Sequence, residues 1–427
     1  ITHDGGTITS GTGGIDGGAM TMSSGVPTAV VTVTGAGTWR LNSLTIQAGG
    51  TFTADAATIT MDGDFNSNAG TFTIGTSTVV FAANGTLTTA ATGSDLYNLT
   101  VNNSITVTLG QDVGMTNNVS IGGAGGGTVT GASRFFRIAG TFTVGAGVTT
   151  MDVDLDWRPV LGTYTLPGLT YNAVLFTNAA STFNLGGNVT VTGGHAESAT
   201  NALRIASGAI LDVTASNYSI TETGGFDVVL SEGASIVSRA ATVSIEGDVA
   251  AQDVASFFTS TALGSWTVSG IWTNPTTSAS WSFAAPITFD SATGGTMTFA
   301  GANLAGAEFD SVTFTSSAGT AQTFTMATRG LRWLTTLTVS DTVSTTALAT
   351  ADLALGAAAD AAAITVGNGG ILTANASTVL INGFTMTGGT SGTLTITTGA
   401  WTVSGNWNSS GASSVFTQGT GIHTFDA

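Results

Sequence analysis

Three copies of one twenty-residue pattern recur along the chain, and this repetition constrains the fold more than any other feature. Residues 44–63 (LTIQAGGTFTADAATITMDG) return as residues 364–383 (ITVGNGGILTANASTVLING), and a weaker copy occupies residues 203–222. Successive copies start about 160 residues apart, and self-similarity at a fixed spacing is the signature of repeat architectures. The chain therefore repeats one structural unit, which argues against a fold built once around a single active site.

Apolar residues alternate with threonine or serine through most of the chain. Residues 189–194 (VTVTGG) and 337–341 (LTVSD) are typical, and Gly-Gly, Gly-Asn or Ser-Gly pairs separate such runs. This pattern predicts short, half-buried β-strands separated by turns. Residues 347–363 (ALATADLALGAAADAAA) are the exception, since their alanine and leucine content predicts a short helix.

The long repeat predicts a parallel β-solenoid. A period of about 160 residues divides into seven or eight turns of roughly 20–23 residues, a common turn size in solenoids. The motif WTVSGIW at residues 266–272 returns as WTVSGNW at residues 401–407, which supports repeated stacking. We place superrepeat boundaries at residues 1–180, 181–335 and 336–427. Tandem β-sandwich domains of roughly 100 residues each are the alternative all-β fold.

Composition excludes several kinds of partner. Only 8% of the 427 residues are charged, every basic residue is an arginine, and the net charge is −17. Nucleic-acid binding is not expected, because it requires a basic surface that releases counterions. No apolar run reaches the roughly 18 residues of a membrane-spanning helix, so membrane insertion is not expected either. The absence of cysteine rules out disulfides and thiol catalysis.

One acidic strand is the strongest candidate for a binding site. In the sequence MDVDLDW, Asp152, Asp154 and Asp156 alternate with apolar residues, so a regular strand would present all three carboxylates on one face. Such a cluster requires a counter-charge, which either Arg158 or a bound cation supplies. Calcium takes oxygen ligands of this kind and is the one metal that we consider. The structural alternative is a solvated strand face opposite an apolar core face.

Catalysis is not expected. Polysaccharide-cleaving β-helices need paired carboxylates in a groove, or a calcium ion with a basic side chain. The three histidines, His3, His195 and His423, lie far apart in the sequence, and no nucleophile motif accompanies them. Arg134 and Arg137 form a small basic cluster that we interpret as rim residues that either pair with aspartates or cap carbonyl groups. We therefore predict that the protein is not an enzyme.

The eight tryptophans have two interpretations. They could be stacking platforms for sugar rings, or they could pack between successive turns inside the core. Trp266 and Trp272 would face the same side of a regular strand, but a glycine between them interrupts the strand. Core packing is the preferred interpretation.

Two segments carry a resemblance to known proteins. Residues 63–81 (GDFNSNAGTFTIGTSTVVF) and 96–113 (LYNLTVNNSITVTLGQDV) resemble repeats of very large secreted bacterial and archaeal surface proteins. Those repeats form parallel β-helices similar to filamentous-haemagglutinin and autotransporter-passenger regions. The resemblance implies an extracellular, cell-surface location and offers no catalytic residues to carry over.

From this resemblance and the repeats we expect a non-catalytic structural subunit of an extracellular filament or surface appendage. It would form homo-oligomers or filaments through exposed solenoid ends or strand addition. A glycan-binding adhesin segment of a large surface protein is the alternative, with surface glycans as partners. A polysaccharide-active β-helix enzyme is the third interpretation.

Overall fold

The chain folds into two compact units. Unit 1 comprises Ile1–Ser181 and Gly186–Ala202, and unit 2 comprises Thr182–Leu185 and Leu203–Ala427. The three superrepeats at residues 1–180, 181–335 and 336–427 stay a prediction. The computed structural model describes residues 1–10, 15–22, 29–91, 95–178, 181–206, 208–213, 218–231, 233–238, 242–251, 257–260, 264–274, 280–290, 295–299, 307–315, 322–327, 333–340, 346–349, 363–367, 370–374, 379–387, 392–396, 398–411 and 413–426.

Unit 1 is built from three rows of strands. The first row is β2 (Gly6–Ser10), β5 (Ala29–Val33), β8 (Thr51–Thr53) and β11 (Thr71–Thr73). The second row is β3 (Ile15–Gly17), β6 (Thr38–Leu41), β9 (Thr58–Met61), β12 (Thr78–Phe81), β14 (Asn98–Val101), β17 (Val119–Ile121) and β19 (Phe142–Val144). The third row is β1 (Thr2–His3), β4 (Met20–Met22), β7 (Leu44–Ile46), β10 (Phe65–Asn66), β13 (Gly85–Thr88), β15 (Thr106–Leu109), β16 (Val113–Met115), β18 (Thr128–Ile138), β20 (Thr150–Trp157), β21 (Thr163–Leu166), β22 (Thr170–Phe176) and β24 (Val189–Val191).

Unit 2 continues the same kind of architecture, and β25 (Asn201–Ile205) contains the boundary between the units. Its strands are β23 (Thr182–Leu185), β26 (Ile210–Asp212), β27 (Ile220–Glu222), β28 (Asp227–Leu230), β29 (Ser235–Ser238), β30 (Thr242–Ile245), β31 (Val249–Ala251), β32 (Phe257–Ser260), β33 (Ser265–Val268), β34 (Trp272–Asn274), β35 (Ser280–Phe283), β36 (Ile287–Asp290), β37 (Gly295–Phe299), β38 (Ala307–Thr315), β39 (Gln322–Ala327), β40 (Trp333–Ser340), β41 (Thr346–Ala349), β42 (Ala363–Gly367), β43 (Ile371–Ala374), β44 (Val379–Ile381), β45 (Gly383–Thr387), β46 (Thr393–Ile396), β47 (Trp401–Val403), β48 (Trp407–Asn408), β49 (Val415–Gln418) and β50 (His423–Phe425).

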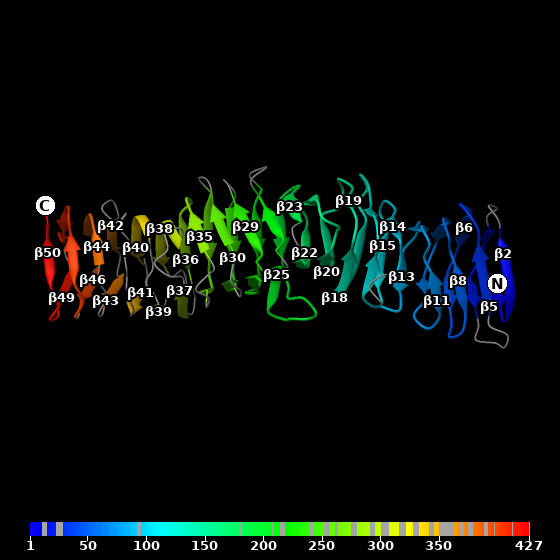
Figure 1. The fold of residues 1–427 in the computed structure, drawn as a ribbon, viewed down its shortest axis with the longest axis horizontal. Coiled ribbons are helices and arrows are strands. Elements are labelled where there is room, and N and C mark those ends of the chain that lie inside the picture. The colour runs from blue at the N-terminus through cyan, green and yellow to red at the C-terminus, as the bar shows by residue number, and fades with distance from the viewer. Residues whose placement is uncertain are drawn as a thin grey trace. The chain divides into compact units, whose positions relative to one another are not determined.

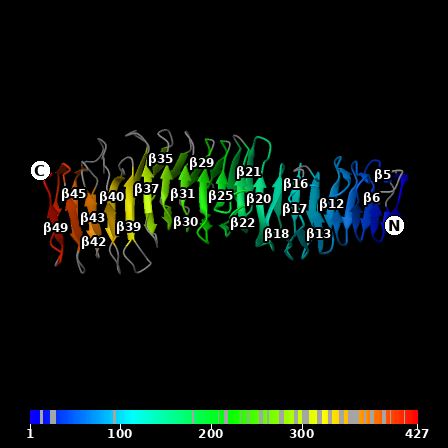
Figure 2. The same ribbon diagram turned by 90° about the horizontal axis from the view of Figure 1, so that it is seen from below.

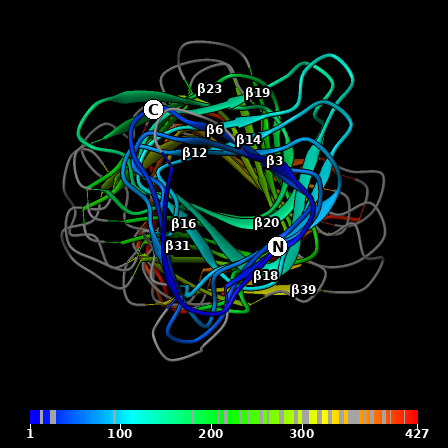
Figure 3. The same ribbon diagram turned by 90° about the vertical axis from the view of Figure 1, so that its right-hand side faces the viewer.

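Each unit is a parallel β-solenoid, which confirms the predicted fold. Leu44 is aligned with Phe65, and Phe65 with Leu87, so these turns take 21 and 22 residues. Within each unit, the strands of one row lie side by side (Figures 1 and 2), and Figure 3 shows β6, β12 and β14 on one wall of the turn. The parallel ladders exclude tandem β-sandwiches, because sandwich strands pair antiparallel.

The three sequence copies fold into the same tight turn. The backbone N–H of Gly50 donates to the carbonyl oxygen of Gln47 at 2.9 Å, between β7 and β8. At the matched positions Ala209 donates to Ala206 at 3.0 Å, and Gly370 donates to a carbonyl three residues earlier at 2.8 Å. In each copy a strand precedes this turn and another follows it. The repeat in the sequence is therefore a repeat of one strand–turn–strand unit.

The predicted helix at residues 347–363 is wrong for its first three residues. Residues 346–349 form β41, which pairs in parallel with β39 and β43. Tertiary pairing overrides the helix propensity of alanine and leucine there, and residues 350–362 lie outside the described residues. Within the described part of the chain, no helix is long and apolar enough to span a membrane.

Aromatic side chains fill the interior of both units. Within unit 1, Phe52 stacks on Phe72 of the next turn, with ring centroids 5.8 Å apart. Six tryptophans are almost completely buried, which confirms core packing for them: Trp39, Trp157, Trp266, Trp272, Trp333 and Trp401. Trp407 is half-buried, and the side chain of Trp281 lies outside the described residues. The buried tryptophans are not available as sugar-stacking platforms.

Aspartate and asparagine side chains at the corners of the turns link each turn to the next. Asp64 accepts the backbone N–H of Thr86 at 2.7 Å, and Asn84 accepts that of Thr106 at 2.8 Å. A backbone N–H at a corner has no ladder partner, and an unpaired buried donor destabilises the fold. An acceptor side chain satisfies it, whereas lysine offers only donors. Part of the acidic bias of the chain therefore has a structural cause.

Candidate functional site

A row of threonines crosses the outer face of unit 1. Thr106 of β15 is aligned with Thr128 of β18. One turn after Thr128, Thr150 of β20 is aligned with Thr170 of β22, and Thr170 is aligned with Thr190 of β24. Neighbouring strands in a sheet lie about 4.8 Å apart, so the row presents hydroxyl and methyl groups at a regular spacing.

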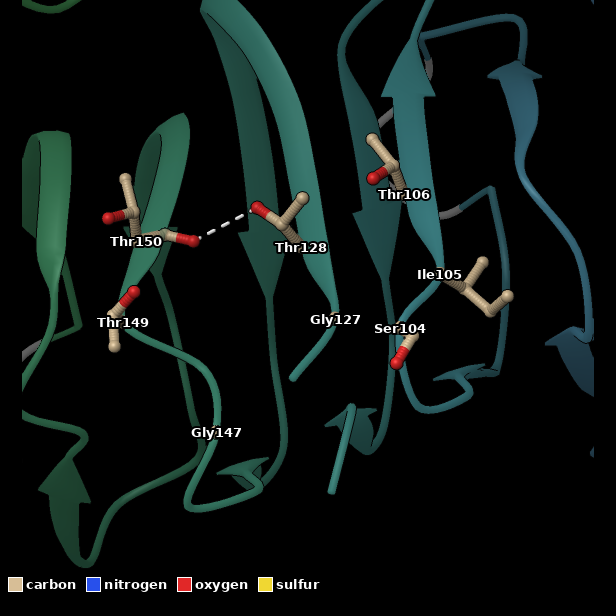
Figure 4. Close-up of a pocket in the computed structure, with 8 residues that line it drawn as sticks. All are labelled: Ser104, Ile105, Thr106, Gly127, Thr128, Gly147, Thr149 and Thr150. Carbon is tan, nitrogen blue, oxygen red and sulfur yellow. Dashed lines mark hydrogen bonds between the residues drawn. The ribbon is translucent and has the colours of Figure 1, made fainter. Parts of the chain in front are cut away.

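An open groove of about 310 Å³ runs along part of this row (Figure 4). Thr106, Thr128 and Thr150 line it, together with Ser104 and Thr149. The hydroxyl of Thr128 donates to the carbonyl oxygen of Thr150 at 2.9 Å. The lining holds no charged side chain and no imidazole, so it can hydrogen-bond a neutral polar ligand but offers no nucleophile–base pair.

The predicted acidic strand is partly exposed at its start, on this face, and is buried in its second half. Asp152 is exposed and aligned with Thr130 of the preceding turn. The register of β20 shifts after Met151, where the strand passes a corner of the solenoid. Asp154 and Asp156, which follow the shift, are 0% exposed. The structural alternative, a solvated strand face, therefore holds for Asp152 but is wrong for Asp154 and Asp156, which other parts of the chain cover.

Asp154 anchors a distant segment, residues 192–200, which we call the strap. One carboxylate oxygen accepts the backbone N–H of Ala196 in the strap at 2.7 Å. The other accepts the side-chain amide of Asn172, on the next turn, at 2.6 Å. Burial raises the pKa of Asp154, and these two hydrogen bonds oppose that rise. The role of Asp154 in this arrangement is to hold the strap against the outer face of the sheet.

His195 belongs to the strap, and its side chain is buried against the sheet. Its side chain is 1% exposed, and its ring centroid lies 6.2 Å from that of Phe135, on the second half of β18. Nδ1 accepts the backbone N–H groups of Glu197 and Ser198, both at 3.1 Å. The imidazole therefore folds the strap into a compact turn and packs over an aromatic ring.

Asp156 is neutralised by two arginines, as the sequence predicted for Arg158. The distance from Nη2 of Arg158 to a carboxylate oxygen of Asp156 is 2.6 Å, and that from Nε of Arg137 is 3.5 Å. Thr177 donates its hydroxyl to the same carboxylate at 2.9 Å. Arg137 also pairs with Asp112 at 3.2 Å, which confirms its predicted pairing with aspartate. This network ties together four successive turns.

The three predicted calcium ligands do not converge in the structure. Asp154 accepts a hydrogen bond from the strap, Asp156 forms ion pairs with arginines, and Asp152 faces solvent. Among the described residues, no group of three or more histidine, aspartate or glutamate side chains is arranged to hold a metal ion. A calcium ion on Asp152, Asp154 and Asp156 would have to displace these partners, and the calcium site stays a prediction.

Sequence reasoning missed Asn172 and the strap as partners of Asp154. Asn172 lies 18 residues away, and Ala196 lies 42 residues away. A weak signal existed, because the strand alternation stops at residues 193–200 (GGHAESAT), a stretch too long for a simple corner. That signal predicts a longer loop at this position, but it does not predict which part of the sheet the loop contacts.

Comparison with family models, with curated proteins and with solved structures finds no match for this chain. The described face of unit 1 combines a neutral, hydroxyl-lined groove with a closed ionic network.

The raised pKa of Asp154 gives a pH prediction. An acid whose pKa is higher in the folded state adds stability below its unfolded value of about 3.9, and this contribution is lost as pH rises through the folded value. The variant Asp154→Asn has no titratable group at this position and keeps most of the shape of the side chain. We expect the difference in unfolding free energy, wild type minus variant, to be largest near pH 3 and to decrease towards pH 7. Urea unfolding across that range measures it, and a difference that grows with pH would contradict the assignment.

Proposed function

We propose that this protein is a non-catalytic structural subunit of an extracellular filament or cell-surface appendage, in which solenoid turns stack end to end. The single observation that carries the proposal is the parallel stacking of turns in each unit. Core positions exposed on the last described turn are where a further turn could stack. In a solenoid each turn contacts only its neighbours, so an uncovered turn is a surface suited to receive another turn.

The uncovered positions are aligned with buried residues one turn earlier. Phe425 of β50 is aligned with Val403 of β47, and the two are 62% and 2% exposed. Phe416 of β49 is aligned with Leu394 of β46, and these are 40% and 0% exposed. Ile422, between the two strands, is 71% exposed. Stacking a further turn here would remove apolar surface from water at about 25 cal/mol per Å².

The first described turn offers a matching surface. Ile8 of β2 is partly exposed, whereas Val31, aligned with it on β5, is fully buried. Ile15 of β3 stands in the same relation to the buried Trp39 of β6. If these two different surfaces bind each other, the contact is head-to-tail, and such a contact repeats without closing and produces a filament. Backbone hydrogen bonds across the contact would be a form of strand addition.

Other features support the extracellular assignment and rank the alternatives. The resemblance of residues 63–81 to repeats of secreted surface proteins favours a location outside the cell. The glycan-binding alternative has less support, since six tryptophans are buried and not available for sugar stacking, whereas the threonine-lined groove could hydrogen-bond a sugar. The enzyme alternative has the least, since that groove has no titratable side chain.

The proposal predicts concentration-dependent polymerisation. We expect the chain to lengthen into rods between about 1 µM and 1 mM, a range that covers contacts of ordinary affinity, when followed by sedimentation velocity and negative-stain microscopy. The double variant Ile422→Glu/Phe425→Glu should fold, because both side chains are exposed, and should not polymerise. Thr108→Glu/Ser120→Glu adds the same charge on the side of unit 1 and should polymerise normally. A wild-type chain without rods, or rods in the end-surface variant, would contradict end-to-end stacking.

A further inference from the structure

The closed conformation of the strap depends on the imidazole of His195. Its Nδ1 accepts the backbone N–H groups of Glu197 and Ser198, both at 3.1 Å, and the side chain is 1% exposed. A ring nitrogen that accepts a hydrogen bond carries no proton, so this arrangement requires the neutral imidazole. The closed strap therefore selects one protonation state of a side chain that titrates near neutral pH.

Protonation would reverse the role of Nδ1. Both ring nitrogens of an imidazolium are donors, so a proton on Nδ1 would point at the two backbone N–H groups that Nδ1 accepts in the closed strap. Those N–H groups would lose their acceptor, and the charged ring would lie away from water. The closed strap and the protonated ring therefore exclude each other.

The charges on the neighbouring strands act on the ring in both directions. On β18 the guanidinium carbon of Arg137 lies 4.6 Å from the centroid of the Phe135 ring, against which His195 packs, and this cation disfavours a second positive charge nearby. Asp112 and Asp156 are each paired with arginine. The carboxylate of Asp154 on β20 would favour imidazolium, but burial raises its pKa, so acid removes that negative charge as well. β22 carries no charged side chain. The other charged groups on these elements are exposed, so that water screens them: Arg134, Asp152, Arg158 and Glu197.

The strap packs on an apolar part of the outer face of unit 1. Phe135, Ala173 and Leu175 form a cluster of buried side chains. Phe135 is aligned with Asp154, and Asp154 with Ala173, so these positions lie side by side on three successive turns. His195 packs on Phe135, and Ala196 donates its backbone N–H to Asp154. Release of the strap would therefore uncover apolar surface around Phe135.

We propose that the strap is an acid-sensitive latch, in which protonation of His195 releases residues 192–200 from the outer face of unit 1 and uncovers the apolar cluster around Phe135. A histidine in contact with water has a pKa of about 6.5, so the released strap gains a proton below that pH, whereas the closed strap does not. The stability of the closed strap is therefore fully present above about pH 6.5 and decreases as pH falls below that value. The latch belongs to unit 1 and is independent of the end-to-end stacking proposed above.

Hydrogen exchange on the full chain tests the latch through the backbone amides of Ala196, Glu197 and Ser198. The chain carries Ile422→Glu/Phe425→Glu, so that end contacts do not contribute, and a chelator is present throughout. After correction for the intrinsic pH dependence of exchange, opening of the strap should increase about tenfold between pH 7.5 and 5.5. At pH 5.5 about ten released imidazoles are protonated for each neutral one, which gives this factor. Binding of a fluorescent hydrophobic dye should increase over the same range, as Phe135 is uncovered.

His195→Asn is the matched control, because its side-chain carbonyl oxygen can accept the same backbone N–H groups, as asparagine does in turns, but does not titrate. His195→Ala removes the acceptor and should leave the strap open at both pH values. The increase in opening at pH 5.5 should be absent from both variants. Titration of His3, His423 and Asp154 cancels in the comparison, since all three chains contain these residues. Equal opening of the unsubstituted strap at pH 7.5 and 5.5, or the same increase in His195→Asn, would overturn the latch.

Discussion

Replacing Trp157 with alanine is expected to lower the unfolding free energy of unit 1 by about 3–5 kcal/mol, the usual cost of removing a buried tryptophan. Its side chain is 1% exposed and contacts the rings of Phe142 and Tyr164. Alanine would leave a cavity between two turns and would deprive the Gly140 carbonyl of its indole donor. The backbone of Trp157 is paired with neighbouring strands at Ile138 and Phe176, so the loss comes from side-chain contacts and not from the ladder.

Urea unfolding followed by circular dichroism measures the loss, and hydrogen exchange locates it. Because a solenoid turn contacts only its neighbours, loss of protection should be concentrated in strands β17–β22. Trp157→Phe keeps a ring but loses the indole N–H donor. It should lower the unfolding free energy by about 1 kcal/mol for the lost hydrogen bond, plus a smaller amount for the cavity that it leaves. Trp407→Ala, at a half-buried position, should cost less than Trp157→Ala. If Trp157→Ala lowered the unfolding free energy by less than about 1 kcal/mol, Trp157 would not be an important part of the core of unit 1.

The fold was predictable because its main determinants are local. Strict alternation predicts strands, and the glycines near Gly50 and Gly370 predict the tight turns that the structure contains. The spacing of the repeat predicts turns of roughly 20–23 residues, which match the observed registers. The helix predicted at residues 347–363 failed at β41, where pairing with strands of the adjacent turns outweighs helix propensity.

The candidate site was less predictable because its determinants are distant in the sequence. Alternation correctly placed Asp152 on the outer face, but it could not reveal the register shift that follows Met151. It also could not reveal that a strap some 40 residues later would contact Asp154. Arg158 was identified because it lies two residues from Asp156, a contact that local reasoning can reach.

Removing the buried carboxylate with Asp156→Ala is expected to destabilise unit 1 by about 3 kcal/mol, the lower end of the range for breaking a buried ion pair. The Asp156 side chain is 1% exposed, and Arg137 is 17% exposed. Without the carboxylate, Arg137 keeps its ion pair with Asp112 and its contact with the Phe135 ring, and the hydroxyl of Thr177 loses its acceptor. Arg158 moderates the loss, because its side chain is 51% exposed and water can solvate it.

Asp152→Ala is the matched control, because it removes the same group from the same strand at an exposed position. We expect it to change the unfolding free energy by no more than about 0.5 kcal/mol, as surface substitutions usually do. Denaturant unfolding of both variants, under identical salt, measures the contrast. Equal effects at the two positions would contradict the ionic network as the reason for burying Asp156.

The same pair of variants separates a structural network from the predicted calcium site. If Asp152, Asp154 and Asp156 bound calcium, the ion would stabilise the wild type by mass action, and a chelator would remove that stability. Asp152→Ala would then lose the calcium response along with Asp156→Ala. If the arginines are the counter-charge, a chelator should leave all three proteins unchanged. High salt should reduce the cost of Asp156→Ala only slightly, because a buried pair is weakly screened.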